Sequence, residues 1–126
     1  MSENNGRTSV AIVDDEASVV RTYELLFKRR NIPLAFTALD GGEAIEKFKD
    51  SNPKPKVVII DYRLPSMSGV ELMEKLLACE PDTKIIFISG DDSIQGNVLS
   101  LGADIFLKKP TTIDVITKSV NSLLAS

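Results

Sequence analysis

The sequence contains no histidine and a single cysteine, Cys79. A serine or cysteine nucleophile activated by histidine is therefore excluded, as is an ordinary zinc site, and no histidine can carry a phosphoryl group. One cysteine also rules out an intramolecular disulfide. Any chemistry of this chain must depend on carboxylates, hydroxyls and lysines.

The chain also lacks an excess of charge of one sign and any long apolar run. Its 126 residues carry 15 Lys and Arg against 18 Asp and Glu, and this net charge of -3 favours neither nucleic-acid nor membrane-surface binding. No run reaches transmembrane length, and the polar N-terminus lacks the apolar segment of a signal peptide. We expect a cytoplasmic protein with one domain over residues 9–126 and a flexible lead-in over residues 1–8.

Five short apolar runs predict the strands of a buried sheet. They cover residues 9–15, 33–38, 56–61, 84–90 and 104–110. The runs are rich in β-branched residues, bounded by turn residues, and too continuously apolar to have one face in water, which is typical of parallel strands. Stretches with helical apolar spacing lie between them.

Capping patterns at residues 40–43, 68–71 and 111–114 predict three helix starts, and Gly102 predicts the end of the fourth helix. The alternation of strands and helices predicts an α/β fold with five βα units. Its sheet would be parallel and covered on both faces, in the flavodoxin-like strand order 2-1-3-4-5.

Polar side chains stand where the predicted strands end. The first run ends on Asp14 and Asp15, the third on Asp61, the fourth on Ser89, and the fifth on Lys108 and Lys109. In a parallel sheet these ends share one edge, where ligands bind. Three carboxylates brought together repel one another unless a cation neutralises them, and hard oxygen ligands suit Mg²⁺ or Mn²⁺. Because an aspartate can accept a phosphoryl group covalently, Asp61 is the candidate acceptor.

Four motifs in this chain resemble the receiver domain of two-component response regulators. They are VDDE at residues 13–16, DYRLPSMSG at residues 61–69, ISG at residues 88–90 and GADIFLKKP at residues 102–110. Each is weak alone, but all four occur in order and at the spacing of βα units. The resemblance covers the chain from about Val10 onward. It implies a signalling switch that catalyses only its own phosphoryl transfer and dephosphorylation.

The resemblance implies that a sensor histidine kinase or a phosphotransfer protein phosphorylates Asp61 in a reaction that depends on Mg²⁺. The metal would bind Asp15, Asp61 and the backbone carbonyl of Arg63, and Asp14 would act mainly through water. We further hypothesise that the Arg63 side chain reaches toward Asp91 or Asp92 and slows loss of the phosphoryl group.

Ser89 and Lys109 would contact the phosphoryl oxygens, and we choose Lys109 over Lys108 because the lysine of the family directly precedes a proline. The Lys109–Pro110 bond would be cis. Ser89 and Phe106 would form the switch that reports phosphorylation to the surface of the fourth helix, fifth strand and fifth helix. A downstream protein or a second copy of the chain would bind there.

Other interpretations of these residues remain open. Asp14 and Asp15 can simply cap a helix, and Phe106 can be only a core residue. The chain can also be a receiver that is never phosphorylated and serves as an interaction module. A phosphatase of the haloacid dehalogenase type needs a second aspartate two residues after its nucleophile, where this chain has Arg63. A flavodoxin needs a phosphate-binding loop where this chain has the acidic DDEAS.

Overall fold

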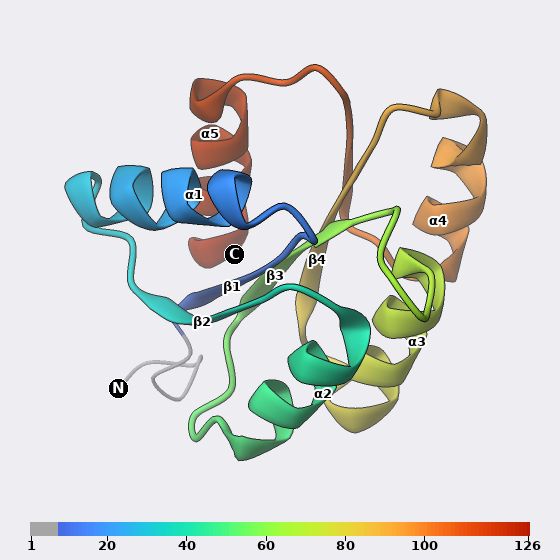
Figure 1. Ribbon diagram of the computed structural model, residues 1–126, viewed down its shortest axis with the longest axis horizontal. Coiled ribbons are helices and arrows are strands. Elements are labelled where there is room, and N and C mark those ends of the chain that lie inside the picture. Colours follow the sequence, from blue (N-terminus) through green and yellow to red (C-terminus); the bar gives the residue numbers. More distant parts are fainter. Residues whose placement is uncertain (1–7) are drawn as a thin grey trace.

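Residues 8–126 are described by a computed structural model in which five parallel strands form one sheet (Figure 1). The strands are β1 (Val10–Val13), β2 (Leu34–Ala38), β3 (Val57–Asp61), β4 (Lys84–Ser89) and β5 (Ile105–Lys108). Their order is β2-β1-β3-β4-β5, and every neighbouring pair is parallel. The predicted flavodoxin-like fold is therefore confirmed. Of the predicted lead-in, residues 1–7 lie outside the described residues.

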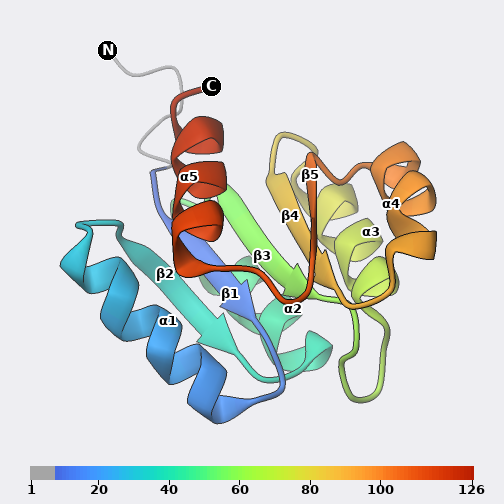
Figure 2. The same cartoon turned by 90° about the horizontal axis from the view of Figure 1, so that it is seen from above.

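Helices cover both faces of the sheet. They are α1 (Ala17–Arg29), α2 (Gly41–Asp50), α3 (Gly69–Cys79), α4 (Gln95–Leu101), which follows a 3-10 turn (Asp92–Ile94), and α5 (Ile113–Leu124). The helices α1 and α5 lie on one face, and α2, α3 and α4 lie on the other (Figure 2). The three layers leave the carboxyl ends of the strands at one edge.

The central strands β1, β3 and β4 are buried on both sides because their apolar side chains alternate between two cores, whereas the edge strands β2 and β5 are only partly buried. In β3, Val58 and Ile60 join the core under α2, α3 and α4, while Val57 and Ile59 join the core under α1 and α5. All five residues of β3 are buried, including the terminal Asp61. Continuous apolar strands are the expected consequence of a sheet with two covered faces.

Two of the three predicted helix starts are confirmed. The side chain of Asp40 accepts a hydrogen bond from the Glu43 N–H at 2.8 Å, and Ser68 accepts one from the Glu71 N–H at 3.2 Å. The third start was placed one residue too early, because the side chain of Thr112, not Thr111, accepts from the helix at 3.2 Å. Thr111 instead lines a cavity between α1 and α5.

Two further expectations about the backbone are confirmed. Gly102 ends α4 with a φ of 128°, a conformation that other residues rarely adopt. A side-chain Cβ there would also lie 2.7 Å from Leu77. The Lys109–Pro110 peptide is cis.

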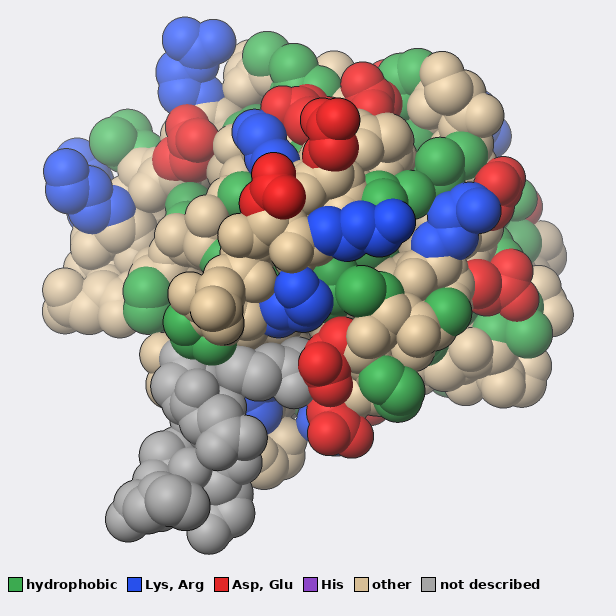
Figure 3. Space-filling model, turned by 90° about the horizontal axis from the view of Figure 1, so that it is seen from below, with side chains coloured by type: hydrophobic (Ala, Val, Ile, Leu, Met, Phe, Trp, Pro, Cys, Tyr) green, Lys and Arg blue, Asp and Glu red, His purple; other side chains and the backbone are tan. Residues whose placement is uncertain are grey.

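The surface carries both charges. Figure 3 shows Lys and Arg side chains interspersed with Asp and Glu on the face that it displays. Among residues 8–126, no helix is both long and apolar enough to cross a membrane.

Candidate phosphoacceptor and metal site

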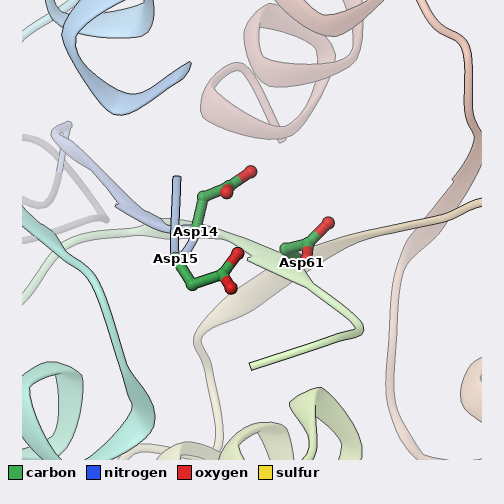
Figure 4. Close-up of side chains that lie close together, drawn as sticks. All are labelled: Asp14, Asp15 and Asp61. Atoms are coloured by element: carbon green, nitrogen blue, oxygen red, sulfur yellow. The ribbon is translucent and has the colours of Figure 1, made fainter. Parts of the chain in front are cut away.

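Three carboxylates meet at the carboxyl edge of the sheet, as the strand ends predicted. Asp14 and Asp15 directly follow β1, and Asp61 is the last residue of the neighbouring strand β3. Each offers a carboxylate oxygen, and these oxygens all lie within 4.8 Å of one another (Figure 4). The parallel pairing of β1 with β3 thus brings together residues that are far apart in the sequence.

The electrostatics of this cluster are unfavourable without a cation. Asp14 and Asp61 are buried, with 7% and 5% of their surface exposed, whereas Asp15 is exposed. Burial raises the pKa of Asp14, and the negative charge of Asp61 adds to this; a hydrogen bond from the Glu16 N–H at 2.9 Å opposes them. The carboxylate set fits a hard divalent cation, which would offset both the repulsion and the desolvation.

Lys109 is the cation that the structure places beside Asp61. Its Nζ atom lies 2.5 Å from Oδ1 of Asp61. That oxygen is buried and, within the described part of the chain, accepts no hydrogen bond of regular geometry, so we treat the contact as an ion pair. Desolvation acts to lower the pKa of Lys109, but pairing with Asp61 and the charge of Asp14 outweigh it and raise the pKa.

Ser89 lines a cavity beside Asp61. This cavity has a volume of about 480 Å³ and is lined by Asp61, Tyr62, Arg63, Ser89, Gly90, Asp91 and Lys109. Ser89 is the buried last residue of β4, and its Oγ accepts a hydrogen bond from the Asp91 N–H at 3.0 Å. Its hydroxyl and the ammonium of Lys109 therefore line the same cavity as the Asp61 carboxylate.

The two adjacent lysines at the end of β5 have different partners. Lys109 pairs with Asp61, whereas Lys108 pairs with the exposed Asp92 at 3.3 Å. This geometry agrees with the choice of Lys109 over Lys108 as the lysine of the site.

Arg63 is exposed and lines the cavity that contains Ser89. The pKa of Asp91 is lowered first by hydrogen bonds from the Ser93 side chain and backbone, and the positive charge of Arg63 adds a smaller effect. Asp92, the other partner considered, is paired with Lys108. The positive charge of Arg63 therefore acts on Asp91, together with that of Lys108.

Phe106 is half-buried in the middle of β5 and packs against the core under α2, α3 and α4. Its ring is therefore neither a fully buried core residue nor a free surface residue. A side chain at this border can change its exposure without opening the core.

Tyr23, in α1, lies near the site, although its position in the sequence predicted only that it is part of the apolar face of a helix. It lines a cavity of about 530 Å³ that also contains Asp14, Asp61 and Lys109 and extends between α1 and α5. Burial raises the pKa of Tyr23 to about 12, and the charges of Asp14 and Asp61 contribute. The phenol is thus a neutral neighbour of the carboxylates.

Comparisons with known proteins identify the class of protein that this fold and site define. The sequence profile of the response regulator receiver domain matches residues 10–121, so the chain belongs to this family. The matched residues lie within the predicted domain of residues 9–126. Receiver domains are signalling domains that interact with histidine kinases and with downstream targets.

Individual relatives indicate a CheY-like receiver. The chain is similar to the chemotaxis protein CheY of Treponema pallidum, with 28% identity over 96% of this chain and 85% of the relative. It superimposes on the receiver domain of the Francisella response regulator 1452 with a TM-score of 0.85 and 28% identity, covering 94% and 97% of the two chains. A structure described as the CheX-CheY-BeF3-Mg+2 complex from Borrelia burgdorferi gives a TM-score of 0.85 and 28% identity, covering 94% and 90%.

Proposed function

We propose that this chain is a phosphoacceptor receiver in which Asp61 takes a phosphoryl group from a sensor histidine kinase or a phosphotransfer protein. The observation that carries the proposal is the position of Asp61. This carboxylate ends a buried strand, pairs with Lys109 and lies within 4.8 Å of two further carboxylates. A buried charge in such surroundings is typical of a functional group.

The metal of the reaction would be Mg²⁺, or Mn²⁺ in its place, held by Asp15, Asp61 and the backbone carbonyl of Arg63, with Asp14 acting mainly through water. When bound, the ion supplies positive charge that offsets the carboxylates and the phosphoryl oxygens. The close carboxylate oxygens of Asp14, Asp15 and Asp61 support this assignment. The similar structure from Borrelia burgdorferi is a CheX-CheY-BeF3-Mg+2 complex.

In the transfer step, an oxygen of the Asp61 carboxylate attacks the phosphorus of a phosphohistidine on the donor. The new O–P bond forms as the P–N bond breaks, and the imidazole leaves with the bonding electrons. Lys109 would exchange its contact with Asp61 for the phosphoryl oxygens, and the Ser89 hydroxyl would donate to them. Both groups already line the cavity beside Asp61.

Phosphorylation would then change the surface of α4, β5 and α5. Ser89 follows β4 into the 3-10 turn before α4, and Phe106 lies at the border of the core in β5. Movement of the hydroxyl toward the phosphoryl group would release its bond from Asp91 and allow the Phe106 ring to turn inward. The changed surface would bind a downstream protein or a second copy of the chain, in the cytoplasm.

The test is intact mass after incubation with acetyl phosphate, with and without Mg²⁺, on the wild-type protein and on Asp61→Asn. We expect one phosphoryl adduct that needs Mg²⁺ and is absent from Asp61→Asn. A folded wild-type protein that binds Mg²⁺ but gains no mass would instead favour an interaction module that is never phosphorylated. Turnover of a phosphate ester without a stable adduct would favour a phosphatase.

A further inference from the structure

The loop that follows Asp61 is held at both ends by backbone hydrogen bonds. In this β3–α3 loop (residues 62–68), the Tyr62 N–H donates to the carbonyl of Ile88 at 3.0 Å, and the Gly69 N–H donates to the carbonyl of Tyr62 at 2.9 Å. These bonds fix where the loop leaves β3 and where it enters α3. A third bond, from the Met67 N–H to the Pro65 carbonyl, lies inside the loop, and none of the three involves Arg63.

The middle of the loop has an unusual backbone. Ser66 has a φ of 73°, in the left-handed region that non-glycine residues rarely adopt. Such a conformation persists only where the surrounding structure enforces it. A hydrogen bond from the Met67 N–H to the Pro65 carbonyl at 2.9 Å closes the turn around Ser66. Met67 is half-buried and, like Leu64 earlier in the loop, packs against the core under α2, α3 and α4, so its side chain joins this turn to the core.

Met67 packs against a glycine at the start of α2. Gly41 is the buried first residue of this helix. A Cβ atom at Gly41 would lie 2.5 Å from Cγ and 2.6 Å from Sδ of Met67, closer than real Cβ contacts allow. A Cβ at Gly42, one residue later, would approach only Oδ1 of Asp40, at 3.4 Å. Of these two neighbouring glycines, Gly41 alone is needed for the methionine to reach its place.

We propose that the packing of Met67 against Gly41 positions the β3–α3 loop, including the Arg63 carbonyl, for the metal. Gly41 and Met67 are then positioning residues of the site, although neither touches Asp61. The start of α2, on a different βα unit, thereby sets the affinity for Mg²⁺. The inference rests on the proposed function, because Arg63 is a metal ligand only within it.

The experiment measures the dissociation constant of Mg²⁺ by calorimetry, and the amide shifts of Arg63 and Leu64 by NMR during the same titration. The variants are Gly41→Ala, Met67→Ala and the double variant, with Gly42→Ala as the matched control. Both replacements add one methyl group in the first turn of α2, and only the one at the buried Gly41 clashes with Met67. Thermal unfolding without Mg²⁺ reports structural damage separately.

We expect Gly41→Ala to weaken Mg²⁺ binding by about tenfold, the scale seen when residues that orient metal ligands are changed. Gly42→Ala should bind Mg²⁺ as the wild type does, because a methyl group there meets no methionine. The double variant should bind no more weakly than Met67→Ala alone, since the clash is absent and the two effects are not additive.

Equal Mg²⁺ affinity in Gly41→Ala and Gly42→Ala would overturn the inference. If Gly41→Ala does not fold, Met67→Ala decides instead: wild-type affinity and unchanged Arg63 shifts in that variant would overturn it too. A wild-type protein that binds no Mg²⁺ and accepts no phosphoryl group would overturn the proposed function itself. The two failures are therefore distinct.

Discussion

The two edges of the sheet each hold a lysine, and they use it in opposite ways. At the amino edge, Lys56 is 8% exposed, and its Nζ atom donates to the backbone carbonyls of Leu124 at 3.0 Å and Ser126 at 2.5 Å. At the carboxyl edge, the Lys109 side chain is 43% exposed and pairs with the buried carboxylate of Asp61. The first lysine binds main-chain oxygens at the end of α5, and the second binds a side-chain carboxylate.

The difference separates a structural contact from a functional one. The last carbonyls of a helix have no partner within the helix and carry the negative end of its dipole, so Lys56 joins the end of α5 to the start of β3. At the other edge, three carboxylates face one ammonium, and the pKa of Asp14 is raised. An edge with too few partners is destabilising in the free protein, and this is expected where a ligand supplies the missing charge.

The largest effect is expected for Lys109→Met, which removes the positive charge beside Asp61, the proposed phosphoryl acceptor. The rate of phosphorylation by acetyl phosphate should fall by about 100-fold or more, the scale of losing one group that stabilises charge in a transition state. Lys108→Met is the matched control, because its side chain pairs with the exposed Asp92. Intact mass at successive times of the reaction measures the rate of phosphorylation for both variants. Equal rates would show that Lys109 has no role in the reaction.

The next effect concerns stability and belongs to the other edge. Lys56→Met should lower the free energy of unfolding by about 1–3 kcal/mol, because the main-chain oxygens of Leu124 and Ser126 lose a charged donor. Affinity for Mg²⁺ should not change. Urea unfolding and calorimetry measure the two quantities, and Lys49→Met, at an exposed position of α2, is the control. A variant with full stability would show that Lys56 does not hold the two elements together.

A smaller effect is expected for the pH dependence of stability without Mg²⁺. Because burial raises the pKa of Asp14 above 3.8, the folded protein binds more protons than the unfolded chain between 3.8 and the higher folded value. The contribution of Asp14 to stability therefore falls as pH rises through this window.

Asp14→Asn should remove that dependence. It should also raise the free energy of unfolding at pH 7 without Mg²⁺, by a smaller amount than the decrease expected for Lys56→Met. The side-chain oxygen of the Asn can still accept the hydrogen bond from the Glu16 N–H. Urea unfolding of both proteins over a pH series measures this difference. An Asn variant that is less stable than the wild type at pH 7 would contradict the account of the carboxyl edge.

The smallest effect is expected for Arg63→Ala. If Arg63 shields the phosphoryl group through its influence on Asp91, the label should be lost about two- to fivefold faster, the scale of an exposed ion pair. The half-life of the adduct after removal of acetyl phosphate is the measurement. Loss at the wild-type rate would end this hypothesis without affecting the assignment of Asp61.

Local sequence signals predicted the fold and the position of the main site residues. β-branched runs identified the strands, and their ends placed Asp14, Asp61 and Lys109 at one edge, because a parallel sheet aligns its carboxyl ends. The side-chain caps at Asp40 and Ser68 were predictable for a local reason: a cap depends on residues three positions apart. What these signals share is that topology or a short spacing determines the contact.

Contacts set by packing were not predictable. The partners of Lys56 lie 68 and 70 positions away in the sequence. The packing of Met67 against Gly41 joins two different βα units. The facing of Tyr23 toward Asp14 depends on how α1 is rotated against the sheet, which apolar spacing defines only coarsely. Two adjacent threonines precede α5, and the sequence does not indicate which of them, here Thr112, caps the helix.

The most direct test of the central claim locates the phosphoryl group. After incubation with acetyl phosphate and Mg²⁺, borohydride reduction converts an aspartyl phosphate to homoserine, and peptide mapping finds the altered residue. We predict conversion at Asp61 alone, because it is the carboxylate that Lys109 contacts and that shares a cavity with Ser89. Conversion at Asp14 or Asp15, or at no aspartate in a protein that binds Mg²⁺, would contradict it.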